Sequence, residues 1–287
     1  MRPVSVDHYE NFPVASLLCP PRLRPAVRAI YAFARTADDL ADEGDAPPTT
    51  RLSDLADYRR DLQATVAGAP TSKRWPVVFT ALGRAIEEHR LPLSLLIDLL
   101  SAFEQDVVKQ RYADRAELLD YCRRSANPVG RLLLHMYALE DPASLARSDA
   151  VCTALQLTNF WQDLGVDTRR GRLYVPLADC QRHAVLADEL LAHRDSPKLR
   201  GLIADVVGWT HDLMCEGALL AFELRGRAGW ELRMVVQGGL RILEKIERNR
   251  HDCLTRRPVL RTIDAPMLLW RALTMRGSRR AARPNVA

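Results

Sequence analysis

Residues 156–167 read Gln156-Leu-Thr-Asn-Phe-Trp-Gln-Asp-Leu-Gly-Val-Asp167, an apolar segment interrupted by polar side chains at a regular interval. Asn159, Asp163 and Asp167 follow one another at a spacing of four, so on an α-helix their oxygen atoms line one stripe, with Gln156 one turn earlier. The apolar neighbours indicate that the stripe points inward, where polar groups need partners. A solvated polar face is the alternative, but the apolar surroundings favour a functional site.

A second acidic segment, Arg35-Thr-Ala-Asp-Asp-Leu-Ala-Asp-Glu43, ends an apolar helical pattern near the N-terminus. Asp38 and Asp42 are also four residues apart, which places their Cβ atoms about 5–6 Å from each other on one helix face. Adjacent carboxylates at a helix C-terminus are unfavourable, and a divalent cation would reverse that effect. Taken alone, the segment is better explained as a solvated acidic helix end, because acidic runs are common there.

The two segments together indicate more than either does alone. Carboxylates on two facing helices can hold several magnesium ions, which in turn can bind a diphosphate. Arg35, Arg169, Arg170 and Arg172 lie close in sequence to the two segments and can add positive charge for phosphate oxygens. At least one of Arg169 and Arg170 is expected to be an ordinary surface arginine.

Helical patterning dominates the rest of the chain. Apolar residues recur three and four apart in the segments 27–41, 93–108, 151–166, 202–222 and 234–246. Prolines divide the chain into roughly eight to ten helices, and the best strand-like pattern is Arg172–Leu177. We therefore predict an all-α protein. Since composition does not change along the 287 residues, we expect a single domain, 1–287, with 276–287 as a frayed tail.

Composition excludes several classes of protein. Hydrophobic residues make up 47% and charged residues 27%, which is typical of a globular protein and not of a disordered one. The net charge of +5 is modest and the arginines are scattered, so we expect no nucleic-acid partner. The six cysteines form no CxxC pair and no zinc motif.

The sequence also bears on location. It has no N-terminal secretory signal and no stretch of roughly 18 apolar residues, so we expect a cytoplasmic protein. Peripheral contact with the inner face of a membrane stays open. The basic region near the C-terminus could be an amphipathic lipid-binding helix, although a solvated Arg-rich tail is the simpler explanation.

These motifs resemble the squalene and phytoene synthase family, whose members build long isoprenoids by head-to-head condensation. The resemblance covers most of the chain. It rests on Tyr31-Ala-Phe-Ala-Arg35 leading into Asp38–Asp42, on Tyr121-Cys122, on Gln156–Asn159 leading to Asp163 and Asp167, and on Gly171-Arg-Leu-Tyr-Val-Pro176. It implies an isoprenoid-synthase helical bundle around a central cavity.

The resemblance also implies a metal site. Asp38, Asp42, Asp163 and Asp167 would bind several magnesium ions across the cavity, with Asn159 as a further ligand. The acidic residues would thereby act in catalysis through the metal ions.

The remaining site residues follow from the same resemblance. Arg35, Arg172, Gln156 and Asn159 would bind the diphosphate, as would His8, which is placed like an N-terminal phosphate-proximal histidine of relatives. Tyr31, Tyr121 and Tyr174 would line the cavity near the phosphate or the carbocation, as catalytic residues. A tyrosine can present its ring to a cation and its hydroxyl to phosphate, although core packing explains each tyrosine equally well.

The chain departs from the usual family pattern in ways that suggest a branch. Gln162 stands where many relatives have arginine, and Phe160-Trp161 replaces the typical leucine or isoleucine. Together with Asn11-Phe12-Pro13 and Ser125-Ala126-Asn127-Pro128, these departures are similar to the hydroxysqualene synthase branch of bacterial hopanoid biosynthesis.

This branch implies a magnesium-dependent conversion of presqualene diphosphate and water to hydroxysqualene and diphosphate, without NADPH. Asn127 is one candidate for placing the water, and the end of a helix before Pro128 is the other explanation for it. Two alternatives remain: a head-to-head prenyl synthase that makes presqualene diphosphate, squalene or a phytoene-type product from farnesyl diphosphate, and a non-catalytic helical scaffold. Expected partners are the isoprenoid diphosphate substrate and, as an open question, other pathway enzymes.

Overall fold

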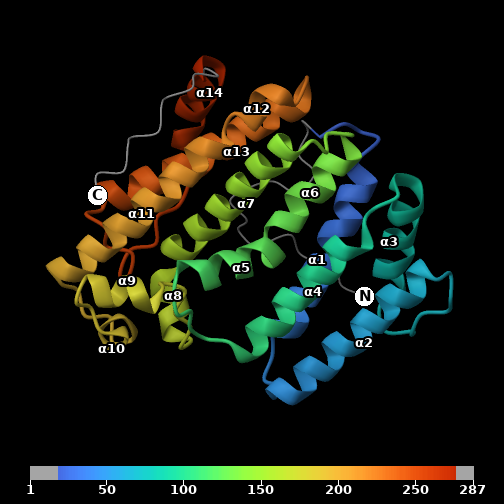
Figure 1. The fold of residues 1–287 in the computed structure, drawn as a ribbon, viewed down its shortest axis with the longest axis horizontal. Coiled ribbons are helices and arrows are strands. Elements are labelled where there is room, and N and C mark those ends of the chain that lie inside the picture. The colour runs from blue at the N-terminus through green and yellow to red at the C-terminus, as the bar shows by residue number, and fades with distance from the viewer. Residues whose placement is uncertain (1–18, 276–287) are drawn as a thin grey trace.

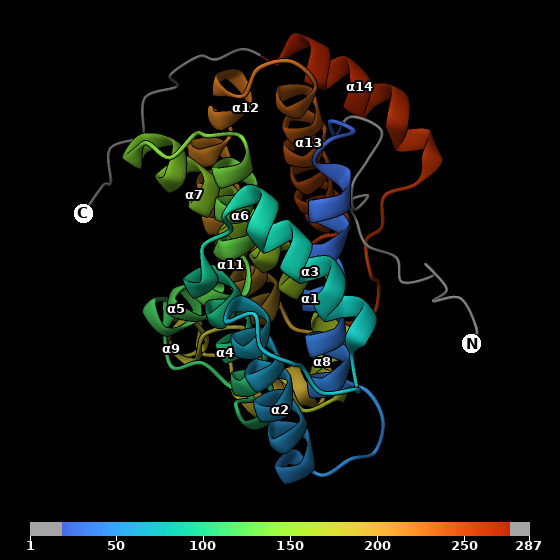
Figure 2. The ribbon, with the colours of Figure 1, turned by 90° about the vertical axis from the view of Figure 1, so that its right-hand side faces the viewer.

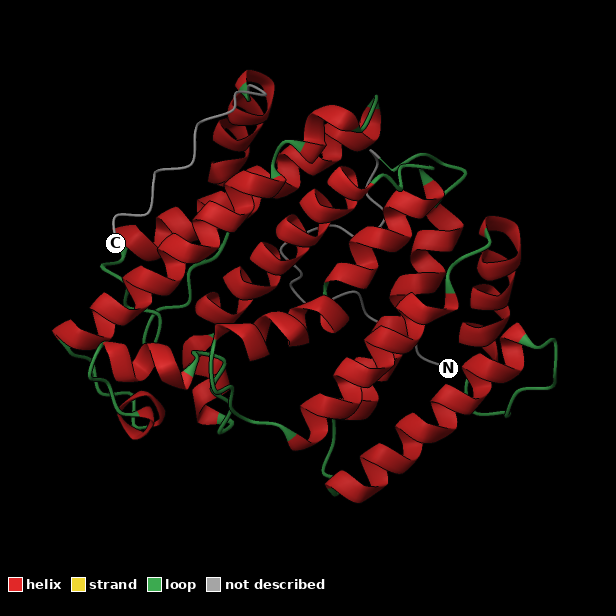
Figure 3. Ribbon diagram, viewed as in Figure 1, coloured by secondary structure: helices red, strands yellow, loops and turns green. Residues whose placement is uncertain are grey.

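The computed structural model describes residues 19–275, and within that range every regular element is a helix (Figure 3). In chain order the helices are α1 (Arg24–Asp42), α2 (Pro48–Val66), α3 (Pro76–His89), α4 (Leu93–Val108), α5 (Arg115–Ser125), α6 (Asn127–Met136), α7 (Pro142–Gln162), α8 (Leu164–Arg169), α9 (Leu177–Arg182), α10 (Ala187–Leu191), α11 (Pro197–Gly217), α12 (Leu220–Glu223), α13 (Arg227–Arg248), the 3₁₀ helix η1 (Thr262–Asp264) and α14 (Ala265–Thr274). The predicted all-α class is confirmed.

The helices begin where the sequence supplies starting signals. A proline occupies the first turn of α1, α2, α3, α6, α7, α11 and α14, where its missing N–H leaves no hydrogen bond unmade. Asp114, Asp141 and Ser196 cap α5, α7 and α11 by accepting hydrogen bonds from backbone N–H groups of the first turn.

The number of helices is higher than the expected eight to ten. The difference comes from α8, α9, α10 and α12, which have four to six residues each and are too short to produce a periodic pattern. The predicted strand-like segment 172–177 is an extended connection instead. Its backbone makes one parallel bridge, Arg111 to Leu173, the only β-type pairing in the described part of the chain.

The bundle has two large hydrophobic cores, one on each side of α6 and α7. Helices α1 to α4 lie together on the right of Figure 1, whereas α11, α13 and α14 lie on the left. The first core contains the stacked rings of Phe33 and Tyr58, with centroids 5.3 Å apart, and the Tyr58 hydroxyl donates to the Phe33 carbonyl. The second contains Trp161, which is fully buried and donates from Nε1 to Thr210 Oγ1 at 2.7 Å. Figure 2 shows α14 at one end of the bundle and α2 at the other, with α1 along the right-hand side.

Within residues 19–275, none of the helices combines the length and the apolar character needed to cross a bilayer. The predicted single domain 1–287 stays a prediction, and the segment 276–287, expected to be frayed, lies outside the described residues.

A buried carboxylate at the start of α14 attaches this helix to α13. Asp264 is 3% exposed and accepts hydrogen bonds from Arg241, from Lys245 and from the backbone N–H of Arg261. Burial alone would raise the pKa of Asp264, but the hydrogen bonds from Lys245, the Arg261 amide and Arg241 outweigh it and lower the pKa to about 2. The ionised carboxylate therefore stabilises the folded state.

We predict that Asp264→Ala lowers the free energy of unfolding at pH 7 by on the order of 3 kcal/mol, because it takes a buried carboxylate away from two partly buried cations, Arg241 and Lys245. Since the folded pKa lies below the ordinary aspartate value of about 3.9, this stabilisation is present above pH 4 and is lost as the pH falls toward 2. Urea unfolding measures both effects. Asp195→Ala, which breaks an exposed pair with Arg200, is the control and should change stability by less than about 1 kcal/mol.

Candidate active site

A cavity of about 700 Å³ lies between α1, α6, α7 and the α12–α13 region. Its wall is formed by positions that recur three and four apart on two helices, namely 27, 30, 31, 34 and 38 on α1 and 148, 151, 152, 155, 156 and 159 on α7. Most of these side chains are apolar. Asp38 and Asp163, the lining residues nearest the C-terminal ends of α1 and α7, bring both acidic segments to one cavity.

The first acidic segment forms the last turns of α1 and is organised by Arg35. The guanidinium of Arg35 contacts Asp38 Oδ2 at 3.0 Å, Asp39 Oδ1 at 2.7 Å and Glu43 Oε1 at 3.0 Å. One cation thus neutralises part of a crowded anionic helix end, where the helix dipole is also unfavourable for carboxylates. Arg35 lies where it was predicted, beside the aspartates.

The second acidic segment is not one continuous helix, and in this respect the prediction was wrong. Helix α7 ends at Gln162, Asp163 has φ −98° and ψ 8°, and α8 begins at Leu164. The physical reason lies at Gly165, whose N–H donates to the Cys253 carbonyl and where a Cβ atom would lie only 2.2 Å from the Leu254 carbonyl oxygen. The Gly165 N–H therefore bonds to residue 253 and not to the carbonyl four residues earlier, and α7 does not continue.

The break separates Asp163 from Asp167 and brings in an arginine that sequence reasoning missed. Asp163 lines the cavity and is bound by both Nε and Nη2 of Arg257, the latter at 3.2 Å from Oδ2. Arg257 is 94 positions further along the chain, in a run of arginines without a local motif. The contact between Gly165 and the 253–254 backbone helps to place it here.

Arg172 joins the two acidic segments directly. It forms a bidentate ion pair with Asp42, with 2.7 Å between Nη1 and Oδ2, although the two residues are 130 positions apart. This pairing raises the pKa of Arg172. Asp167 lies close enough to Asp42 and Arg172 for both charges to influence its own pKa. The acidic groups of α1 and α8 therefore share one end of the cavity.

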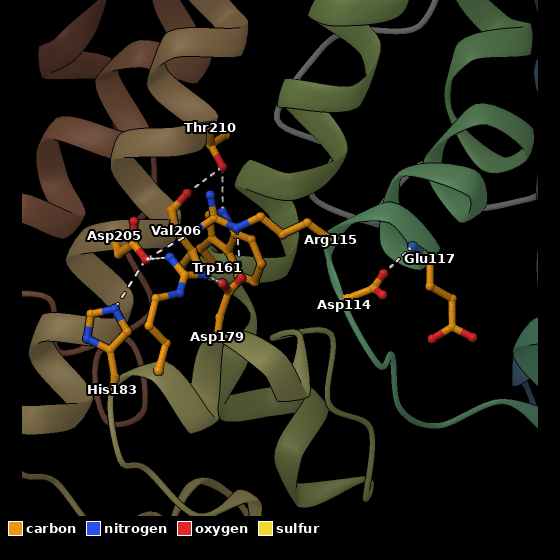
Figure 4. A network of polar contacts seen from close by, with 10 residues as sticks. Asp114, Arg115, Glu117, Trp161, Asp179, His183, Asp205, Val206 and Thr210 are labelled. Carbon is orange, nitrogen blue, oxygen red and sulfur yellow. Dashed lines mark hydrogen bonds and ion pairs between the residues drawn. The ribbon is translucent and has the colours of Figure 1, made fainter. Parts of the chain in front are cut away.

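The connection that carries Arg172 is fixed on both sides. Three backbone hydrogen bonds of 2.8–2.9 Å run from Leu173, Leu177 and Ala178 to the carbonyls of residues 110, 112 and 113. Just beyond it, the buried carboxylate of Asp179 accepts from Arg115 Nε at 2.9 Å. Figure 4 shows Arg115 reaching from α5 between Asp179 and Asp205, beside Trp161. This network holds the connection against α5 and α11.

The tyrosines form an aromatic wall next to a third carboxylate. The Tyr121 hydroxyl donates to Asp106 Oδ2 at 2.8 Å, and the Tyr174 ring stacks on Phe160 with centroids 3.8 Å apart and planes 4° apart. Tyr112 lies against both tyrosines. Asp106, on α4, has no counterpart in the sequence reasoning, since it follows Glu104 and Gln105 in a short polar run and carries no motif.

Burial and mutual repulsion raise the pKa values of three carboxylates. Burial is the largest cause in each case, and it raises the pKa of Asp38 to about 6 and the pKa values of Asp106 and Asp167 to about 7. The nearby charge of Asp42 adds to the rise at Asp38, and that of Asp163 at Asp167. Groups with such shifts are typical of functional sites.

Some of the other residues predicted for the site line the cavity, and others do not. Tyr31, Gln156 and Asn159 line the cavity on the same faces as Asp38 and Asp163. His8 lies outside the described residues.

Asn127 begins α6 and accepts from Thr153 Oγ1 at 3.0 Å in the α6–α7 interface, and it is not among the described lining residues. Gln162 is buried and donates to the Pro258 carbonyl, so it fastens the segment that bears Arg257.

In the part of the chain that the structure describes, no three histidine, cysteine, aspartate or glutamate side chains are grouped closely enough to form a ready metal cluster. The site carboxylates are paired with arginines instead, Asp38 with Arg35, Asp42 with Arg172 and Asp163 with Arg257. Any cation that binds here must displace these arginines from the carboxylates.

We predict that Asp106→Asn increases the free energy of unfolding at pH 8 by about 1–3 kcal/mol, since at that pH the carboxylate is ionised in the unfolded chain and folding must bury its charge or protonate it. The raised pKa means that protonated Asp106 contributes its full stabilisation to the wild-type chain below about pH 4, and that this contribution is lost as the pH rises through 7. The difference in the free energy of unfolding between wild type and variant should therefore shrink in acid. Urea unfolding at pH 8 and pH 5 tests this. Asp120→Asn is the control, because bonds from Arg123 lower the pKa of that exposed carboxyl; an equal gain there would refute the explanation.

Known proteins with similar sequence support one assignment. The squalene/phytoene synthase family model matches residues 6–264. A hydroxysqualene synthase of Rhodopseudomonas palustris is 34% identical over 274 residues, which cover 95% of this chain and 90% of that protein. A phytoene synthase of Thermus thermophilus is 31% identical, over 92% of this chain and 88% of that protein.

Solved structures agree with the sequence comparison. The squalene synthase HpnC from Alicyclobacillus acidocaldarius superposes with a TM-score of 0.78 at 37% identity, covering 85% of this chain and 90% of the other. A dehydrosqualene synthase superposes with a TM-score of 0.73 at 25% identity, covering 89% and 87%. With its two acidic segments on one apolar cavity, the chain belongs to the squalene/phytoene synthase family of isoprenoid synthases.

Proposed function

We propose that this enzyme converts presqualene diphosphate and water to hydroxysqualene and diphosphate in a magnesium-dependent reaction. The observation that carries the proposal is the combination of Asp38 and Asp163 at one end of an otherwise apolar cavity in a chain similar to hydroxysqualene synthases. The cavity volume of about 700 Å³ lies in the range of small-molecule sites. An isoprenoid diphosphate has the matching chemistry, an anionic head and a long apolar tail.

The residues present are suited to magnesium. The candidate ligands Asp38, Asp42, Asn159, Asp163 and Asp167 offer only oxygen atoms, which hard divalent cations prefer. Burial and then repulsion from a neighbouring carboxylate raise the pKa values of Asp38 and Asp167, and bound cations would favour the ionised forms. Bound there, magnesium ions would withdraw electrons from the diphosphate and make it a better leaving group.

The arginines can serve two partners in turn. Arg35, Arg172 and Arg257 hold Asp38, Asp42 and Asp163 in the absence of substrate. Guanidinium groups bind phosphate oxygens with the same fork geometry that they use for carboxylates. With cations bound to the carboxylates, the arginines would be free to hold the diphosphate as its C–O bond breaks and the bonding electron pair leaves with it.

The aromatic and apolar wall would then protect the carbocation. Tyr174 and Phe160 present stacked faces beside Tyr121, and an aromatic ring stabilises a nearby cation. Exclusion of bulk water matters because the cation would otherwise react at several carbons. A single positioned water would add its oxygen to one carbon and release a proton.

A second candidate function deserves a direct comparison, because the chain is also similar to phytoene synthases. A condensing enzyme of that type would use farnesyl diphosphate or a longer prenyl diphosphate as its first substrate. Incubation with farnesyl diphosphate or presqualene diphosphate, each with and without NADPH, separates the two functions.

We predict that presqualene diphosphate, magnesium and isotopically labelled water give an alcohol that carries the label, with no need for NADPH. Product analysis by mass spectrometry provides the readout. A hydrocarbon product, or turnover of farnesyl diphosphate alone, would instead assign the condensing function.

Asp163→Asn should lower kcat by roughly 10²–10³-fold or more, because it removes a cation ligand and the partner of Arg257. The fold should remain intact, since Asp163 lies at the cavity surface. Asp212→Asn, at an exposed position of α11, is the matched control and should retain full activity. Normal turnover of Asp163→Asn would contradict the metal assignment.

Magnesium binding should release protons near neutral pH. Ligand carboxylates must be ionised, and the pKa values of Asp38 and Asp167 are raised to about 6 and 7, so affinity should rise as the pH increases from 5.5 to 8. Calorimetric titration with magnesium and inorganic diphosphate in buffers of different ionisation enthalpy measures this release. A heat signal that is independent of the buffer at pH 6.5 would show that these carboxylates are not ligands.

A further inference from the structure

The last described helix, α14, carries an apolar face that no other described element covers. Ile263, just before the helix, is 81% exposed, and on the helix Leu269, Trp270 and Leu273 are 53%, 63% and 57% exposed. With Pro266, also exposed, these side chains fall within an arc of roughly 120° around the helix axis at 100° per residue. We call these five residues the α14 face.

The opposite side of α14 is fully engaged in packing. Leu268 and Ala272 are buried, and Arg271 is paired with Glu244 of α13. Asp264, at the start of the helix, is fixed by Arg241 and Lys245. The α14 face is therefore held outward by a firm attachment, and the charged groups of this helix point away from it.

Positive charge flanks the α14 face in the sequence. Arg261 precedes it and is exposed. The twelve residues that follow the described chain, 276–287, contain four arginines and no acidic residue. An uncharged face with Leu and Trp, bordered by arginines, has the composition of a segment that lies in the interface of an anionic bilayer.

The position of α14 gives such a contact a use. Figures 1 and 2 both place α14 at the end of the molecule where α12 and the start of α13 lie. Met275, directly after α14, packs against the same small buried cluster as Leu155 and Leu232, and these two leucines line the cavity. The end of α14 and part of the apolar cavity wall therefore share one group of buried side chains.

From these observations we propose that the α14 face docks this enzyme on the surface of an anionic lipid bilayer. Leu269, Trp270 and Leu273 enter the interface, and Arg261 contacts lipid phosphates. The proposal does not depend on which reaction the enzyme catalyses, because vesicle binding is measured without substrate.

The first test uses the full chain with vesicles of phosphatidylcholine alone or with phosphatidylglycerol. We expect cosedimentation with the anionic vesicles, weakened by high salt, and a loss of affinity of about tenfold or more in the double variant Leu269→Ser, Leu273→Ser. The control variant Val77→Ser, Leu186→Ser removes two exposed apolar side chains elsewhere and should bind like the wild type. Circular dichroism verifies that both variants are folded.

The second test locates the α14 face relative to the bilayer in the wild-type protein, whose fold is unchanged. Brominated lipids should quench the fluorescence of Trp270 in the wild type, and Trp270→Phe should lose most of that quenching. Three results would overturn the proposal: no binding to anionic vesicles, binding that the Leu269, Leu273 double variant retains in full, or a vesicle-independent dimer that the same double variant dissociates. The last result would identify the α14 face as an interface between two copies.

Discussion

The site depends on the repulsion among carboxylates that lie close together beside the cavity. The charge of Asp42 adds to the rise in pKa that burial causes at Asp38, Asp106 and Asp167, and Arg172 opposes that rise at all three. The Arg172–Asp42 pair is the strongest link among them because it is bidentate and joins α1 to the connection after α8. The folded chain thus brings acidic groups from α1, α4 and α8 together around one guanidinium group.

Much of the structure serves to hold arginines opposite these acids. Arg172 is fixed by the backbone pairing with residues 110–113 and by the Arg115–Asp179 pair behind it. Arg257 is fixed by Gln162 and by the approach of the 253–254 backbone to Gly165. These supports are polar and specific, whereas the helices that line the cavity wall are held by ordinary apolar packing. The arginines and the cavity wall are therefore held in place by different kinds of interaction.

Sequence reasoning recovers what is local. The four-residue spacings of Asp38 and Asp42 and of Gln156 to Asp163 predict the cavity-lining faces, and the apolar periodicity predicts α4 to the residue. It fails where the cause is distant in sequence. The helix break at Asp163 comes from the 253–254 backbone, and Asp106 and Arg257 acquire their surroundings only from tertiary contacts. The sequence predicts that Gln162 changes the polar lining of the cavity, whereas its buried amide holds the segment around Pro258 by a hydrogen bond.

The absence of a side chain at Gly165 ties two distant segments into one unit. Because the 253–254 backbone lies where a Cβ atom would be, residues 163–169 and 253–257 cannot shift independently. An exchange of the second acidic segment between relatives would therefore succeed only if the later segment, with its arginine, were transferred as well. These two pieces of sequence, although almost a hundred positions apart, form a single structural module.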